Sequence, residues 1–261
     1  MIYWDVSPEI FSIGPITIRW YGLLFAMSFI VGYQIMMVIF KRENRSEHDL
    51  NDLVWYMILG TVIGARLGHC FFYNPDYYLA HPLEIIQVWK GGLASHGAAI
   101  GILTALYLFV SKKKNFSFLW IVDRIVITVA LSGFFIRMGN LFNSEIIGKP
   151  TNGKWGVVFV SVDNIPRHPA QFYESVAYLL IFIFLLSLYF KLNAKFKNGL
   201  LTGLFLILIF GFRFFVEFFK EIQSMFEQSM FLNMGQLLSI PFVILGIFLL
   251  IRKDKKIIKI Q

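Results

Sequence analysis

The sequence predicts an all-α integral membrane protein with seven transmembrane helices, and three observations support this fold class. Hydrophobic residues make up 57% of the 261 residues and charged residues only 15%, with a mean hydropathy of +0.66, a composition typical of membrane proteins. Seven apolar stretches have the length of about 17 to 25 residues that crosses a bilayer as a helix. Lys and Arg are concentrated in every second connection between these stretches, as the positive-inside rule requires.

The predicted spans follow one another along the whole chain. We expect them at Ile18–Phe40, Leu53–Tyr73, Gly92–Val110, Leu119–Ile136, Ala170–Phe190, Leu200–Phe219 and Met234–Ile251. The first seventeen residues contain no Lys or Arg, so they lack the basic start of a cleavable signal and span one is expected to be retained. No fixed-period repeat interrupts the pattern, and one membrane domain is expected over residues 1–261.

The orientation follows from the basic residues. Connections after spans one, three, five and seven carry 14 of the 24 Lys and Arg, the opposite side carries 6, and the remaining four lie inside the spans. We therefore expect the N-terminus outside and the C-terminus in the cytoplasm. Because the basic residues lie between apolar runs and not on one soluble face, the net charge of +8 reflects topology and indicates no nucleic-acid partner.

Two outer connections have recognisable patterns. His81-Pro82-Leu83 opens a segment rich in Leu, Ile and Trp that stops at Gly91-Gly92, where we expect a helix lying in the membrane interface. The longest connection, an extracytoplasmic loop region over residues 137–169, starts with the polar stretch RMGNLFNSEIIGKPT and contains GVVFV, a short strand, before Pro169 opens span five. Connections of this length in compact bundles are more often functional than idle.

Ionisable side chains inside the spans converge on one depth. Such groups are unfavourable in a membrane unless they are paired or face a wet cavity. With the expected topology, five spans place a charged or titratable group near the outer leaflet, and span one adds two more at its outer start. These groups are Arg66, His69, His96, Arg137, Glu174, Arg213 and Glu217, with Arg19 and Tyr21 in span one. The number of arginines indicates an anionic partner.

Several of these groups also have a structural interpretation. Arg213 and Glu217 lie four residues apart on one helix face and can neutralise each other, and Arg66 can serve as a structural pair partner. Purely structural or interfacial roles are expected for Arg19, His69, Cys70, Asp123 and Arg124.

Common catalytic motifs are absent from the sequence. There is no HExxH, GxSxG or GxxxxGK pattern, and the single Cys70 supplies neither a disulfide nor a thiolate metal site. We expect no metal and no cofactor. Because no thiol or serine has an evident base partner, the nucleophile of any reaction is expected to arrive with a substrate.

The polar stretch at the end of span four resembles the signature of the prolipoprotein diacylglyceryl transferase family, an Arg-x-Gly-Asn-x-x-Asn-x-Glu-x-x-Gly pattern. The matching residues are Arg137, Gly139, Asn140, Asn143, Glu145 and Gly148. The resemblance continues, in order, through IRWYGLLFA, GARLGHCFFYNP, GGLASHG, RHPAQFYE and FRFFVEFF. It therefore covers nearly the whole chain.

The resemblance implies an enzyme of the bacterial inner (plasma) membrane with its active site towards the outer leaflet. Such an enzyme transfers the diacylglyceryl group of phosphatidylglycerol to the thiol of the lipobox cysteine in prolipoprotein signal peptides, the first step of lipoprotein maturation. A thioether and glycerol phosphate are the products. The implied partners are phosphatidylglycerol, the signal peptide and the lipid bilayer, and the substrate protein supplies the missing nucleophile.

The resemblance also implies roles for individual residues. Arg137 and Arg213 would hold the lipid phosphate, and His96 would activate the thiol or manage its proton. The residues implied to line the substrate site are Tyr21, Arg66, Asn140, Asn143, Glu145, Gly148 and Glu217. Guanidinium groups suit a phosphate and stabilise the charge of a phosphate leaving group. A thiol with an ordinary pKa of about 8.5 needs only modest help, so activation by arginines alone is an alternative to a histidine base.

Two other function classes fit parts of the pattern. A transporter or flippase for an anionic lipid or solute could use the same arginines, but it would have charged groups through both leaflets and often an inverted repeat. The inner half offers only Asp123 and Arg124. A seven-span receptor would share the helix count, although the outer arginines and the long polar loop would be unusual for it.

Overall fold

The structure is a computed structural model that describes residues 1–14, 16–221, 227 and 230–253. The last residues of the basic run after span seven, 254–256, lie outside the described residues. Internal contacts divide the chain into two compact units. The first unit contains Met1–Ile35 and the chain from Asp123 onward, and the second contains Met36–Val122. The hydropathy pattern carries no sign of this division, and the single domain stays a prediction.

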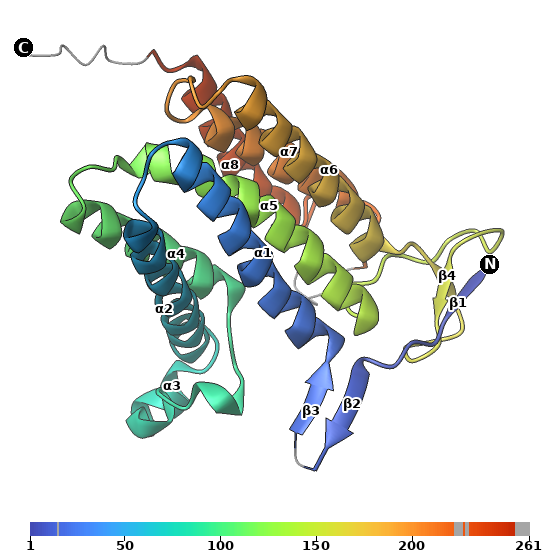
Figure 1. Cartoon of the computed structure of the whole chain (residues 1–261). Helices are drawn as coiled ribbons and strands as arrows, with labels where there is room; N and C mark the ends of the chain where they lie inside the picture. Colours follow the sequence, from blue (N-terminus) through green and yellow to red (C-terminus); the bar gives the residue numbers. More distant parts are fainter. Residues whose placement is uncertain (15, 222–226, 228–229, 254–261) are drawn as a thin grey trace, which may run out of the picture. The chain divides into compact units, whose positions relative to one another are not determined.

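The first unit is built mainly from long apolar helices. These are the first part of α1 (Trp20–Arg42), most of α5 (Phe118–Phe142), α6 (Ala170–Lys191), α7 (Leu200–Val216) and α8 (Met234–Ile251). Helices α5 to α8 form a bundle (Figure 1), in which α7 packs against both α6 and α8. The predicted spans five and seven are confirmed as helices, since α6 begins at Ala170 and α8 has the predicted bounds.

Short strands complete the first unit. In a three-stranded sheet, β1 (Ile2–Trp4) pairs in parallel with β4 (Val157–Phe159), and β4 pairs antiparallel with β5 (Pro166–Arg167). The predicted strand within GVVFV is thus confirmed. A separate hairpin joins β2 (Glu9–Ile13) to β3 (Ile16–Arg19).

The predicted start of span one at Ile18 is wrong, because Ile18 and Arg19 belong to β3 and α1 begins at Trp20. The β-branched run before Trp20 suits a strand, and β2 supplies its pairing partner. The Arg19 guanidinium also pairs with the Glu9 carboxylate at 3.1 Å across the hairpin.

The second unit is organised by α2 (Glu47–Phe72) and α4 (Ser95–Lys112). Gly60 and Gly64 of α2 lie against Gly97 and Gly101 of α4, and a Cβ added to Gly64 would lie 2.4 Å from the Gly97 carbonyl oxygen. Small residues spaced by four allow helix backbones to approach this closely. Lipid tails are as apolar as side chains, so close packing, and not the hydrophobic effect, holds such a pair together in a bilayer.

The connection between α2 and α4 corrects one prediction. Helix α3 (Pro75–Ala80) precedes His81, and after His81 the chain forms two 3-10 turns, η1 (Pro82–Glu84) and η2 (Val88–Lys90), in place of a single interfacial helix. Backbone carbonyls of this segment accept hydrogen bonds from the buried Arg66. Backbone bonds within the two turns, such as that from the Gln87 N–H to the Glu84 carbonyl, span three residues and not the four of an α-helix. Large apolar side chains of the segment remain exposed, including Trp89.

Among the described residues, five helices are long and apolar enough to cross a membrane: α1, α2, α5, α6 and α8. Helix α7 is a shorter apolar helix, and α4 is the remaining predicted span. The structure therefore supports a multi-pass helical membrane protein.

Candidate functional site

The polar stretch that begins at Arg137 continues a helix instead of starting a loop. The predicted end of span four at Ile136, and the predicted start of the loop region at Arg137, are wrong by six residues, because α5 runs to Phe142. The polar side chains of this last part find partners within the protein, as described below, so they do not end the helix. The connection to α6 begins after Phe142.

Helix α5 ends in a Schellman motif. The Glu145 N–H donates to the Asn140 carbonyl at 2.9 Å, and the Ser144 N–H donates to the Leu141 carbonyl at 3.0 Å, the two bonds that define this motif. Ser144 takes the left-handed conformation that the motif needs, with φ of 53°, and Ile146 follows with φ of 57°. The turn folds Glu145 back over the last turn of the helix.

Four signature side chains form one hydrogen-bonded chain at this turn. Arg137 donates to Asn140 Oδ1 at 3.1 Å, and Asn140 Nδ2 donates to Glu145 Oε2 at 3.1 Å. Asn143 Nδ2 donates to the other Glu145 oxygen at 3.2 Å. Gln171 of α6 holds the Glu145 carbonyl oxygen at 2.6 Å. The spacing of the signature thus places its polar groups on one connected surface.

The carboxylate of Glu174 lies at the centre of a buried charge cluster. It is fully buried, and its oxygens lie 3.1 Å from Arg137 Nε and 3.2 Å from Lys220 Nζ. Tyr178, one turn further along α6, donates its hydroxyl at 3.1 Å. One carboxylate therefore joins the ends of α5, α6 and α7.

A second carboxylate, Glu217, continues the charge cluster towards α8. It accepts from Lys220 Nζ at 2.9 Å and from Asn233 Nδ2 at 3.2 Å. The nearest approach of Arg213 to Glu217 is 3.8 Å, too long for a hydrogen bond. The Arg213 side chain makes no hydrogen bond within the described part of the chain and is 34% exposed. Arg213 is therefore the cation of this cluster that is best placed to accept an external anion.

Besides Glu174 Oε2, which is ion-paired with Arg137, two buried acceptors of the site lack a hydrogen bond to any described residue. Asn143 Oδ1 and Gln171 Oε1 have no hydrogen-bond partner among the described residues. Buried acceptors in this state are rare, and each calls for a donor. A ligand with hydroxyl groups would supply such donors.

Two glycines of the signature are required by close contacts. A Cβ on Gly139 would lie 2.7 Å from the Tyr21 ring, so Gly139 lets α1 approach α5 and seats Tyr21 at the site. A Cβ on Gly148 would lie 2.5 Å from the His168 carbonyl oxygen and 2.8 Å from that of Phe219. The chain at Gly148 is held between these segments by backbone hydrogen bonds, so Gly148 shapes the site through its backbone.

The rim of the site is tied together by Arg167. Its guanidinium donates to Asp163 at 2.6 and 2.9 Å, to the Gly148 carbonyl at 3.3 Å and to the Glu221 carboxylate. The Arg167 guanidinium holds the pKa of Asp163 below its ordinary value of 3.8. This cross-link joins the long connection after α5 to the chain that follows α7.

The predicted site residues separate into two sets. Tyr21, Arg137, Arg213 and their neighbours lie in the first unit, and the structure brings the signature chain and the charge cluster together there. Arg66 and His96 lie in the second unit. The predicted convergence across both sets stays a prediction.

Arg66 has a structural role in the second unit. Its guanidinium donates to the backbone carbonyls of Glu84, Ile85 and Gly91 at 2.6 to 2.9 Å, and it lies over the Tyr78 ring at 5.0 Å. With its nitrogens occupied, Arg66 shapes the connection before α4 and is not carried into the proposed substrate site. His96 lies exposed in the first turn of α4.

Sequence reasoning missed three members of the charge cluster. Lys220 lies one residue beyond the predicted span six, where it was counted only as a loop charge, and Asn233 directly precedes α8. Tyr178 was hidden among apolar residues. The spacing of Glu174 and Tyr178 by one helical turn was the available signal.

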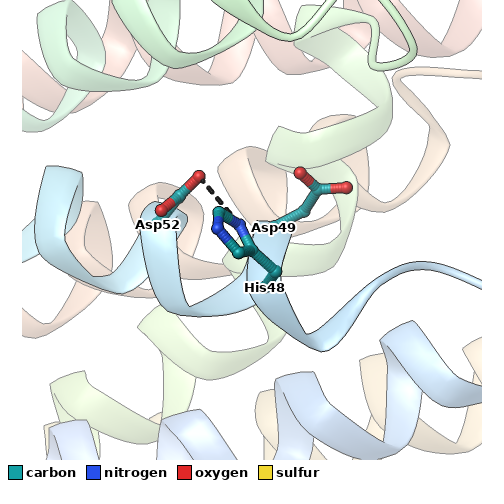
Figure 2. Close-up of side chains that lie close together, drawn as sticks. All are labelled: His48, Asp49 and Asp52. Carbon is teal, nitrogen blue, oxygen red and sulfur yellow. Dashed lines mark ion pairs between the residues drawn. The ribbon is translucent and has the colours of Figure 1, made fainter.

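A different acidic cluster lies at the start of α2. The ligand atoms of His48, Asp49 and Asp52 lie within 4.8 Å of one another (Figure 2). The Lys113 ammonium already contacts Asp49 at 2.7 Å and Asp52 at 2.8 Å, and these hydrogen bonds raise the pKa of Lys113 to about 12. We assign this cluster the structural role of joining α2 to the end of α4.

Comparison with known proteins gives consistent matches over nearly the whole chain. Residues 8–252 match the family model described as prolipoprotein diacylglyceryl transferase. A protein of Chloroherpeton thalassium named phosphatidylglycerol–prolipoprotein diacylglyceryl transferase is 53% identical over 98% of this chain and 95% of its own length. Proteins with the same name are 48% identical in Tolumonas auensis, over 98% of this chain and 99% of their length, and 45% identical in Bacteroides fragilis, over 98% and 96%.

Proposed function

Since the chain belongs to the prolipoprotein diacylglyceryl transferase family, we propose that it transfers the diacylglyceryl group of phosphatidylglycerol to the lipobox cysteine thiol of a prolipoprotein signal peptide. One observation carries the proposal. The signature residues form one hydrogen-bonded chain from Arg137 to Glu145. Ion pairs through Glu174, Lys220 and Glu217 link Arg137 to Arg213, whose guanidinium makes no hydrogen bond to any described residue.

Phosphate binding at Arg213 fits the geometry of the cluster. A guanidinium can donate two parallel hydrogen bonds to phosphate oxygens, and Glu217 is too distant to occupy those donors. Arg137 is fixed by Glu174 and Asn140 and contributes positive charge from a rigid position. The free glycerol hydroxyls of the lipid headgroup are donors that suit the unpaired acceptors Asn143 Oδ1 and Gln171 Oε1.

The proposed reaction forms one bond and breaks one. The cysteine sulfur of the peptide attacks the carbon of the diacylglycerol backbone that carries the phosphate ester, forming the C–S bond. The C–O bond to the phosphate breaks, its electron pair stays on oxygen, and glycerol phosphate leaves. Arg137 and Arg213 stabilise the charge that develops on the leaving phosphate.

The thiol must lose its proton in this reaction, and two routes are proposed as alternatives. In the first, the imidazole of His96 accepts the proton. In the second, the positive field of the arginines lowers the thiol pKa enough for the proton to reach water. A His96→Asn variant separates the two routes. If His96 is the base, kcat should fall strongly at neutral pH and recover as the pH rises, because the thiolate then forms without a base. Unchanged turnover would remove His96 from the mechanism.

The transfer assay tests the function directly. Purified protein in micelles is given phosphatidylglycerol with a labelled glycerol backbone and a lipobox peptide, and lipid-modified peptide is measured by mass spectrometry. We expect product with the cysteine peptide and none with a Cys→Ser peptide. Equal product from the serine peptide would exclude thiol attack.

Arginine variants test the phosphate site. Arg213→Ala should reduce kcat/KM by about 100-fold or more, as loss of a positioned donor to a developing oxyanion does. Arg19→Ala is the matched control, because Arg19 is also an ion-paired arginine but lies in the β2–β3 hairpin. Loss of activity in both variants would show that general charge, not the site, is responsible.

We further propose seven transmembrane spans in the bacterial inner membrane, with the N-terminus and the active site towards the outer leaflet. The five long apolar helices support this proposal, and α4 and α7 would supply the remaining two spans. In a Cys70→Ser background, a cysteine at Asn152 should react with an impermeant maleimide on spheroplasts. A cysteine at Asn115 should react only after permeabilisation, and the reverse labelling would overturn the orientation.

A further inference from the structure

A fully buried carboxylate lies at the other end of the first unit, far from the proposed site. Asp123, at the start of α5, accepts hydrogen bonds from the backbone N–H groups of Gly199 at 2.6 Å and Thr202 at 2.9 Å, and from the Thr202 hydroxyl at 2.6 Å. Its exposure is 0%. Burying a carboxylate is expensive unless it is hydrogen-bonded, and here both oxygens are.

These bonds complete a helix cap from outside the helix. Helix α7 begins at Leu200, and its N-cap residue Gly199, with φ of 94°, has no side chain to cap the first turn. An N-cap side chain normally accepts from the N2 or N3 backbone N–H, and Thr202 occupies N3. Asp123 accepts that bond in its place, and its negative charge also suits the positive end of the helix dipole.

The cap fixes the position of α7 along its axis relative to α5. At about 1.5 Å per residue, Arg137 lies about 21 Å along α5 from Asp123. On α7, Arg213 lies about 17 Å and Glu217 about 23 Å from Thr202 by the same rise. At the far end of the unit, Glu174 contacts Arg137 directly and Glu217 through Lys220.

We infer that Asp123 is a positioning residue that sets the height of Arg213 and Glu217 at the proposed site by anchoring the start of α7. A slip of one residue would move Arg213 by about 1.5 Å, several times the tolerance of a hydrogen bond. Because none of the described residues makes a hydrogen bond to the Arg213 guanidinium, we assign the helix itself the task of holding this side chain at its height. The inference rests on the proposed function for its effect on activity, but not for the geometry of the cap.

The geometry is tested by distance measurement. Spin labels are placed at Val129 of α5 and Phe215 of α7, two exposed positions, in a Cys70→Ser background. Asp123→Ala should shift the distance by about 1.5 Å or more or broaden its distribution. An unchanged distance in folded Asp123→Ala protein would overturn the inference, whether or not the protein is a transferase.

Kinetics test the consequence for the site. In Asp123→Ala, kcat/KM for phosphatidylglycerol should fall about 100-fold, as a misplacement of about 1 Å can cause, while KM for the peptide stays unchanged. Asp123→Asn, which keeps an acceptor for Thr202, should recover most of this loss. A rise in the KM for the peptide, or no recovery with asparagine, would contradict a positioning role.

A destabilised control separates positioning from general loss of stability. Leu185 is fully buried in α6, and its apolar side chain makes none of the hydrogen bonds of the cap. Leu185→Ala should therefore lower thermal stability without changing the label distance or kcat/KM. If Leu185→Ala changes both as Asp123→Ala does, the effect is general and the inference fails. If the wild-type protein transfers no lipid, the proposed function fails, and the label distance still decides the role of Asp123.

Discussion

Replacing Glu174 by Gln should remove the charge that holds three helices together without changing the size of the side chain. The carboxylate has no exposed surface and lies within 3.2 Å of two cationic groups, Arg137 and Lys220. Removing one partner of a buried ion pair costs about 3–5 kcal/mol, because the remaining charge stays buried. The folding equilibrium constant should therefore fall roughly 100- to 4,000-fold.

The experiment is an SDS titration of the protein in mixed micelles, followed by tryptophan fluorescence. Lys220→Met is the comparison, because it removes a cation while Glu174 keeps Arg137 and Glu217 keeps Asn233. Lys220→Met should lower the free energy of unfolding by only about 1–3 kcal/mol. Glu174→Gln leaves Lys220 paired with Glu217 alone. In the double variant this lysine is gone, so the two losses should not add. A Glu174→Gln protein as stable as the wild type, or additivity within about 0.5 kcal/mol, would refute the charge cluster.

Three further changes test the turn and the rim of the site. Gly148→Ala should destabilise the protein by about 1–3 kcal/mol through overpacking, measured by thermal unfolding, whereas Gly211→Ala, whose added Cβ meets nothing within 4 Å, should not. Ser144→Gly should stabilise by about 0.5–1 kcal/mol, because glycine adopts the left-handed conformation without strain; no rise in the unfolding midpoint would contradict the Schellman assignment. The lowered pKa of Asp163 means that its pairing with Arg167 stabilises the fold above about pH 3.8 and is lost as pH falls through the lower folded-state pKa. Hydrogen exchange of this segment should therefore accelerate only in that acid range, and equal acceleration near pH 6 would exclude the pair as its cause.

Position along each helix was the part of the site that the sequence could predict. The lengths of the apolar runs locate each ionisable residue along its span, and Arg137, Glu174 and Glu217 do converge in the first unit. A helix advances by a fixed rise per residue, so position along the chain becomes position along the helix axis. The same reasoning identified α6 and α8 as spans with accurate starts.

Other features depend on backbone geometry that residue types do not encode alone. The guanidinium of Arg66 binds carbonyls about twenty residues away in sequence, and carbonyls belong to every residue. The last turns of α5 look like a loop because Asn140 and Glu145 are polar, yet these two side chains satisfy each other. Lys220 was missed because the apolar run ends one residue earlier, so that a buried lysine resembled an ordinary loop charge.

The contact between α2 and α4 has a consequence for how this sequence can vary. At Gly64 and Gly101 a single methyl group would collide with backbone atoms of the other helix, whereas Leu59 and Ile63 are about half exposed and can be replaced by other apolar residues. A saturation mutagenesis screen of α2 would therefore find intolerant positions every fourth residue. Such a pattern is easily mistaken for a catalytic motif, although here its cause is the short distance between two helix backbones.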